Sequence, residues 1–237
     1  MAILKRFAAP KFWHIEKKTK KFVISPMSGP HAKLSCIPAG ILVRDVLGHA
    51  RNMNEIRAIL RSGAFKVDGR IRREPGFPVG LMDVVTVGNE HYRILPGRKG
   101  LTLAKINSNE AGIKLCRIEN KKYTAKKIQL NLHDGRNVLI EKDNYATGDT
   151  LVIELGKGAI RDVIKMKKGS AGLIISGKNA GRSGRIEGIT ITRSPQPNRI
   201  VMSIGGEAYE IAKDYVIVVG DEKPVINLPE EGKSYSV

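Results

Sequence analysis

The stretch ILVRDVLGHARNMNEIRAILRSGAFKVDGRIRR, residues 41–73, predicts two short helices followed by a β-hairpin. Apolar residues recur at helical spacing in residues 41–47, and Gly48 suits the end of that helix. Asn52, followed three positions later by Glu55, forms a capping-box pattern, which marks the start of a second helix. The stretch therefore begins as a pair of helices joined by a short connection.

The second helix is predicted to be amphipathic with a basic outer face. Ile56, Ile59 and Leu60 have the spacing of a buried stripe. Arg57 and Arg61 are four positions apart and share another face of the helix. We expect these arginines to neutralise phosphates, with a solvated helix face that binds nothing as the alternative.

The hairpin after this helix extends the basic surface. Gly63 suits the end of the helix, and the Asp68-Gly69 dipeptide predicts a tight turn between two strands. Residues 76–95 are rich in valine and indicate further β structure before a linker at residues 96–100. The side chains expected to bind RNA in this module, residues 41–100, are Arg44, Arg51, Arg57, Arg61, Lys66, Arg70, Arg72 and Arg73.

The charge of the chain favours a polyanionic partner. Its 237 residues include 41 Lys and Arg against 23 Asp and Glu, which gives a net charge of +18. A compact body with this excess repels itself, and nucleic acid is the commonest partner that relieves such repulsion. The excess falls on residues 1–168, because residues 169–237 carry equal numbers of acids and bases. We therefore expect RNA to contact mainly the first two-thirds of the chain.

Residues 1–40 are predicted to be a basic arm that becomes ordered only on its partner. Lysines and aromatic residues are interleaved without a clear period, and prolines interrupt them. The single Trp of the chain, Trp13, lies here and would stack on a base unless it packs against protein. A frayed, solvated terminus is the alternative. The RNA contacts expected from the arm are Lys5, Arg6, Lys11, Trp13, Lys17 and Lys18.

The rest of the chain predicts short strands separated by glycine-rich turns. Residues 101–168 indicate a central β-rich domain with lysines on its outer face, and residues 169–220 indicate a small β-barrel. Residues 221–237 are expected to be a loose tail. The predicted fold class is therefore α+β. The strands expected in the central domain are residues 101–106, 113–118, 127–132, 137–140 and 150–154.

One glycine-rich segment comes within one residue of a phosphate-binding P-loop. From Gly172 to Asn179 it places Asn where such a loop needs Ser or Thr to hold magnesium, and apolar, strand-like residues precede Gly177. We therefore predict no nucleotide hydrolysis. Its glycines could instead let a sugar–phosphate chain approach the backbone, with a basic barrel turn as an equal alternative. The RNA contacts expected here are Lys178, Arg182 and Arg185.

We expect no catalytic residue, metal site or cofactor. The five histidines lack metal-binding spacing, and Cys36 and Cys116 are far apart without a zinc motif. The chain has no apolar run of about 18 residues and no start that resembles a signal peptide. We therefore expect a cytoplasmic protein without a membrane or small-molecule partner.

Three blocks of the sequence resemble known modules in a characteristic order. Residues 41–73, continued by 77–85, are similar to a helix–helix–hairpin RNA-binding module of ribosomal and RNA-modifying proteins, and residues 169–188 resemble the KOW motif. Residues 129–135 and 141–148 lie between them and resemble the central domain of the S4e family of archaeal and eukaryotic small-subunit ribosomal proteins. Segments near both ends of the chain fit the same family, namely residues 8–13, 28–31 and 218–224.

This resemblance implies a non-enzymatic ribosomal protein of archaeal type. It implies a cytoplasmic ribosome constituent that binds small-subunit ribosomal RNA and neighbouring small-subunit proteins, with an SH3-like KOW barrel near its C-terminal end. Before Ala8 the basic segment is shorter than is usual in the family, so we expect a reduced outermost RNA contact.

Two other functions share parts of this pattern. An RNA-modifying enzyme can carry the same helix–helix–hairpin module, but residues 101–237 are too short and strand-like for its catalytic domain. A transcription elongation factor can carry a KOW motif, but this function leaves residues 41–73 unexplained. Both stay as alternatives.

Overall fold

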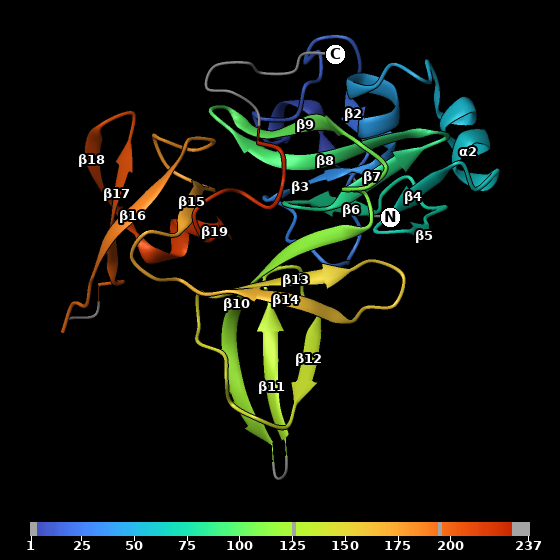
Figure 1. Cartoon of the computed structure of the whole chain (residues 1–237). Coiled ribbons are helices and arrows are strands. Elements are labelled where there is room, and N and C mark those ends of the chain that lie inside the picture. The colour runs from blue at the N-terminus through green and yellow to red at the C-terminus, as the bar shows by residue number, and fades with distance from the viewer. Residues whose placement is uncertain (1–3, 125–126, 194–195, 229–237) are drawn as a thin grey trace. The chain divides into compact units, whose positions relative to one another are not determined.

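The computed structural model describes residues 4–124, 127–193 and 196–228, and it divides them into two compact units. Of the described residues, unit 1 contains 4–95 and 99–112, and unit 2 contains 96–98 and those between 113 and 228. Figure 1 shows many strands and few helices in the described chain. The expected mixture of helices and strands is therefore present, with strands dominant.

Unit 1 is built around a five-stranded sheet in the order β5-β4-β7-β8-β9. Its last strand was assigned to the central domain by sequence, and this assignment is wrong because the strand is the edge of the unit 1 sheet beside β8. Unit 2 resumes only at Ile113 after this strand. The strands are β4 (Phe65–Val67), β5 (Arg70–Ile71), β7 (Val84–Val87), β8 (Glu90–Gly97) and β9 (Gly100–Ile106).

The two predicted helices are present. α1 (Ala39–Ile41) runs directly into the π-helical η2 (Leu42–Val46), and α2 (Met53–Arg61) follows. The side chain of Asn52 accepts hydrogen bonds from two amides of the first turn of α2, each at 3.0 Å, and so caps the helix as predicted. Gly63 follows α2 with φ of +79°, which glycine adopts without steric cost.

The predicted hairpin joins β4 to β5. Asp68 and Gly69 both have positive φ, 51° and 74°, which is the pattern of a two-residue turn between twisted antiparallel strands. The Asp68 carboxylate also accepts a hydrogen bond from the Val84 amide at 3.1 Å, which ties this turn to β7. The hairpin is therefore part of the main sheet of unit 1.

From Leu4 onwards the N-terminal segment is packed into unit 1 and is not a free arm, which corrects the expectation for residues 4–40; residues 1–3 lie outside the described residues. Leu4, Ala9 and Trp13 belong to the same core cluster as the buried faces of the helices. The chain returns through β2 (Phe22–Val23), paired with β1 (Leu4–Lys5), and through β3 (Cys36–Pro38), paired with β6 (Pro78–Gly80). The sequence lacked a period here because these paired pieces are only two or three residues long.

Unit 2 contains two five-stranded antiparallel sheets. The first has the order β12-β11-β10-β13-β14, and the second has the order β18-β17-β16-β15-β19. The strand β14 was not predicted, because charged residues interrupt its alternation. The first sheet comprises β10 (Ile113–Thr124), β11 (Lys127–Leu132), β12 (Asn137–Ile140), β13 (Thr150–Glu154) and β14 (Ile160–Ile164). The second comprises β15 (Ala171–Ile174), β16 (Ser183–Thr190), β17 (Arg199–Ile204), β18 (Glu207–Ala212) and β19 (Val216–Gly220).

Candidate nucleic-acid interface

Helix α2 separates an apolar face from a basic face. Ile56 and Leu60 are fully buried, while Arg57 and Arg61 are exposed. Arg51, in the connection before the helix, is also exposed. Three guanidinium groups on one helix and its entry can therefore meet a polyanion without disturbing the core.

The β4–β5 hairpin adds further exposed cations. Lys66 lies on the outer side of β4, between Phe65 and Val67, which are both buried. Arg70 and Arg73 are exposed at and after β5. Arg51, α2 and the hairpin together supply six exposed cations from one continuous stretch of sequence.

Arg72 is held differently from its neighbours. Its guanidinium lies over the ring of Phe77, 4.3 Å from the ring centroid, in a cation–π contact. A small surface pocket beside this pair is lined by Ile71, Arg73 and Glu74 as well. This contact holds the Arg72 guanidinium beside the ring in the absence of any ligand.

Arg44 is mostly buried, with 14% of its side chain exposed, and already has a counter-charge. It donates to the Asp45 carboxylate, with Nη2 and Oδ2 2.7 Å apart. This pairing lowers the charge that Arg44 can offer to phosphate. Its RNA contact stays a prediction.

The N-terminal segment contributes fewer contacts than the sequence suggested. Trp13 is 3% exposed, and its indole N–H donates to the Cys36 carbonyl at 2.8 Å, so it is not available to stack on a base. Arg6 is also buried, and its guanidinium donates to the Glu16 carbonyl and the Thr19 hydroxyl. Both predictions are wrong, because these side chains complete the core and its hydrogen bonds. The lysines of this segment remain at the surface, with Lys5, Lys11 and Lys18 exposed and Lys17 partly exposed.

The glycine-rich turn between β15 and β16 also carries exposed cations. Lys178 and Arg182 lie in the turn, Arg185 follows it on β16, and all three are exposed. Gly177 and Gly181 have φ of +92° and +87°, and a Cβ at Gly181 would come within 2.9 Å of the Pro96 carbonyl oxygen. These glycines are therefore needed for a tight, closely packed turn, whatever else they permit.

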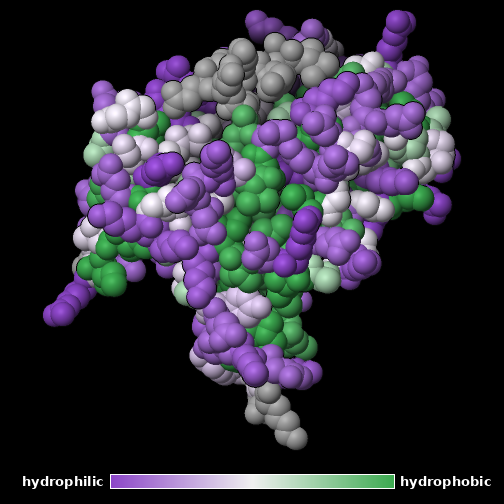
Figure 2. All heavy atoms as spheres, viewed as in Figure 1, coloured by the Kyte–Doolittle hydropathy of each residue, from purple (hydrophilic) through white to green (hydrophobic). Residues whose placement is uncertain are grey.

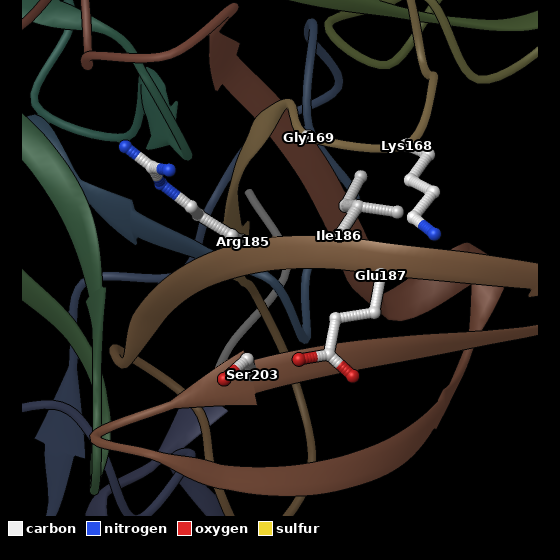
Figure 3. A pocket seen from close by; sticks show the side chains of 6 residues that line it. All are labelled: Lys168, Gly169, Arg185, Ile186, Glu187 and Ser203. Carbon is white, nitrogen blue, oxygen red and sulfur yellow. The ribbon is translucent and has the colours of Figure 1, made fainter.

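A pocket lined by the loop before β15 and by β16 and β17 is a poor phosphate cradle. Lys168 and Arg185 line it but point apart, and the Glu187 carboxylate extends toward Ser203 (Figure 3). A carboxylate in such a pocket repels a phosphate.

The segment from Gly172 to Asn179 does not have the P-loop arrangement. Gly172 lies inside β15, and the chain leaves the turn in β16, whereas a P-loop opens a helix. The absence of nucleotide hydrolysis stays a prediction.

Neither cysteine of the chain is accessible to solvent. Cys36 and Cys116 are buried, and burial together with the charge of Asp83 raises the pKa of the Cys36 thiol to about 12.

Within the part of the chain that the structure describes, no cluster of metal-binding side chains occurs. In those same residues, no helix combines the length and hydrophobicity that crossing a membrane requires. Hydrophilic residues cover much of the visible surface (Figure 2).

Comparison with known proteins places this geometry in a family. Residues 88–160 match the model of ribosomal family S4e, residues 3–34 match the RS4NT domain, and residues 45–85 match the S4 domain. The chain is 44% identical over 232 residues to small ribosomal subunit protein eS4 of Methanothermobacter thermautotrophicus, with 95% of each chain covered. The chain belongs to the S4e family of small-subunit ribosomal proteins.

Other S4e proteins extend this similarity. The eS4 protein of Methanocaldococcus jannaschii is 41% identical over 237 residues, with 95% of this chain and 96% of that protein covered. The crystal structure of 30S ribosomal protein S4e from Thermoplasma acidophilum superposes with a TM-score of 0.70 at 28% identity. It covers 79% of this chain and 96% of its own. The S4 domain match overlaps α2 and the β4–β5 hairpin, where the exposed cations gather.

Proposed function

We propose that this S4e-family protein is a structural constituent of the small ribosomal subunit and binds small-subunit ribosomal RNA. The near full-length similarity to curated eS4 proteins supports this role and a place in the cytoplasmic ribosome. The observation that carries the RNA contact is the set of exposed cations on α2 and the β4–β5 hairpin. RNA and neighbouring small-subunit proteins are its partners, and it performs no catalysis.

The proposed binding module is the helix–helix–hairpin of residues 41–73. Its cations neutralise phosphates while the rigid helix and hairpin fit the shape of an RNA fold. Such contacts fix the position of RNA without reading its sequence. The cations proposed to bind here are Arg51, Arg57, Arg61, Lys66, Arg70, Arg72 and Arg73, with Arg44 in a lesser role.

A second contact is proposed at the β15–β16 turn. We assign residues 169–220 to a KOW-type, SH3-like small barrel, which the five-stranded antiparallel sheet and its glycine-rich turn support. Lys178, Arg182 and Arg185 are its phosphate contacts. The exposed lysines Lys5, Lys11, Lys17 and Lys18 of the N-terminal segment contribute in the same way.

The proposal is tested by sedimentation of ribosomes on a sucrose gradient. A tagged full-length chain expressed in an archaeal host is expected to travel with the small subunit and to leave it after a high-salt wash. A matched variant with Arg57→Ala and Arg61→Ala is expected to be less abundant in that fraction at the same expression level. A chain found only at the top of the gradient would refute the role.

A further inference from the structure

The outer face of the β10–β12 sheet has a composition that sheet stability does not explain. Ile128, Leu130 and Leu132 point into the core from β11 and are buried. Alternation along the strand therefore turns Gln129 and Asn131 outward. Figure 1 shows β10, β11 and β12 running side by side, so their outward residues form one surface. We call this surface the amide face.

Three asparagines form one row across the amide face. Asn120 on β10 pairs with Asn131 on β11, which pairs with Asn137 on β12. Residues that pair directly across antiparallel strands lie on the same side of the sheet, so the three amides are adjacent. Asparagine is depleted in strands because it fits a pleated surface poorly. Three of them in one row therefore cost local stability, and such departures from local preference are expected at functional sites.

The neighbouring rows carry two lysines. Lys122 pairs with Gln129, which pairs with Leu139, and Thr124 pairs with Lys127. Both lysines are exposed and neither forms an ion pair with a described residue. Within β10, β11 and β12 none of the residues in these rows is Asp or Glu, and the first acid in register is Glu141, directly after the end of β12. The amide face therefore carries two positive charges and several groups that can both donate and accept hydrogen bonds.

On the opposite side of the same strands, a lysine is paired with a carboxylate of the chain. Lys121 and Tyr123 alternate with the outward residues of β10, and both bond to the Asp143 carboxylate, at 2.6 and 2.8 Å. There a carboxylate satisfies the lysine. On the amide face the lysines are left for an anion that comes from outside the chain.

We propose that the amide face binds the minor groove of double-helical RNA. This inference rests on the proposed function and extends it to a second surface. The A-form minor groove is wide and shallow and displays 2′-hydroxyls, which both donate and accept hydrogen bonds, as side-chain amides do. A three-stranded surface of hydrogen-bonding side chains can lie along a shallow groove, with the lysines beside it reaching the phosphates. Single-stranded RNA fits less well, because no aromatic side chain lies on these rows of the described sheet to stack on a base.

The first test removes the amides and keeps the fold. The full-length chain with Asn120→Thr, Asn131→Thr and Asn137→Thr should melt at the wild-type temperature or higher, because Thr prefers strands. Its affinity for a double-helical RNA of about 16 base pairs should fall about ten-fold or more, since several hydrogen bonds are removed. Its affinity for a DNA duplex of the same sequence should change little, because DNA lacks the 2′-hydroxyl. Asn144→Thr, at an exposed loop position, is the matched control.

The second test removes the charges. Lys122→Gln with Lys127→Gln should weaken binding to the RNA and DNA duplexes alike, with a salt slope shallower by up to about two. Lys157→Gln, in the turn between β13 and β14, serves as the control for an exposed lysine on the same sheet. Each variant is also measured with Arg57→Ala and Arg61→Ala present, so that α2 does not dominate the binding. Reductions in affinity from separate surfaces should then add as free energies.

Two outcomes would overturn the inference. One is a folded threonine variant that binds the RNA duplex as tightly as wild type in both backgrounds. The other is an equal reduction in affinity for RNA and DNA in that variant, which would exclude recognition of the 2′-hydroxyl. A wild-type chain absent from the small-subunit fraction would refute the proposed function itself, which is a separate result.

Discussion

The N-terminal segment and helix α2 have similar mixtures of basic and apolar residues, but only α2 presents its arginines to solvent. Arg6 is buried and bonded to the chain around it, whereas Arg57 is exposed above a buried apolar stripe. The difference lies in periodicity. A helix separates its faces, while an irregular segment places a cation wherever packing and hydrogen bonding require it. Net charge therefore indicates a partner without identifying the residues that touch it.

The largest change is expected in RNA affinity as the salt concentration rises, because exposed cations are proposed to account for binding. With roughly 6–10 phosphate contacts, the slope of log K against log salt should be about −5 to −9, and the affinity should fall by about 10³–10⁵ between 50 and 200 mM salt. Fluorescence anisotropy with a structured fragment of small-subunit ribosomal RNA measures this. A slope near zero would show that neutralisation of phosphates by exposed cations does not account for RNA binding.

Trp13→Ala tests the buried side of the comparison. Deleting this indole from the core should lower the free energy of unfolding by about 3–5 kcal/mol, as for other large aromatic residues. Urea denaturation measures the change. Because the Ala variant could fail to fold, Trp13→Phe is examined beside it, and its folded form should bind RNA with wild-type affinity. A stable Trp13→Phe variant with weakened RNA binding would show that Trp13 contributes to the RNA interface.

Arg57→Ala with Arg61→Ala tests the exposed side. The melting temperature should stay within a few degrees, because both residues are exposed and Ala is a good helix former. RNA affinity should drop about ten-fold, with a salt slope shallower by about one unit for each phosphate that is no longer neutralised. Arg6→Ala is the matched control, since it should lower the melting temperature and leave the slope unchanged. Wild-type affinity in the double variant would mean that α2 is only a solvated face.

Phe77→Leu tests whether the ring under Arg72 contributes to RNA binding by this cation. Leucine keeps an apolar side chain at this site but removes the ring under Arg72, so RNA affinity should fall about two- to five-fold. In an Arg72→Ala background the same change should have no further effect, and a double-mutant cycle measures this coupling. Additive effects of the two substitutions would show that the ring does not orient Arg72 for RNA.

Lys178→Ala has the smallest expected effect. We expect no hydrolysis of ATP or GTP by the wild-type protein, so the variant should show no change in phosphate release. RNA affinity should weaken slightly through the removal of one exposed charge. Measurable wild-type turnover that this variant abolishes would contradict the assignment of the β15–β16 turn.

The sequence by itself determined the elements whose cause is local. Asn52 and Gly63 bound a helix through cap chemistry, and Asp68-Gly69 forms a turn through its backbone preferences, so both were predictable. Four of the five strands predicted in the central region were found in the first sheet of unit 2 for the same reason. The family resemblance followed from the order of these elements.

Only the tertiary structure decided what lies buried and which distant residues are adjacent. Trp13 enters the core because residues 4–38 return through short paired strands, and β9 belongs to unit 1 because it lies beside β8. The row formed by Asn120, Asn131 and Asn137 depends on strand register, which is fixed by non-local pairing and bulges. Burial and register are sums over interactions between distant residues, so a local pattern cannot determine them.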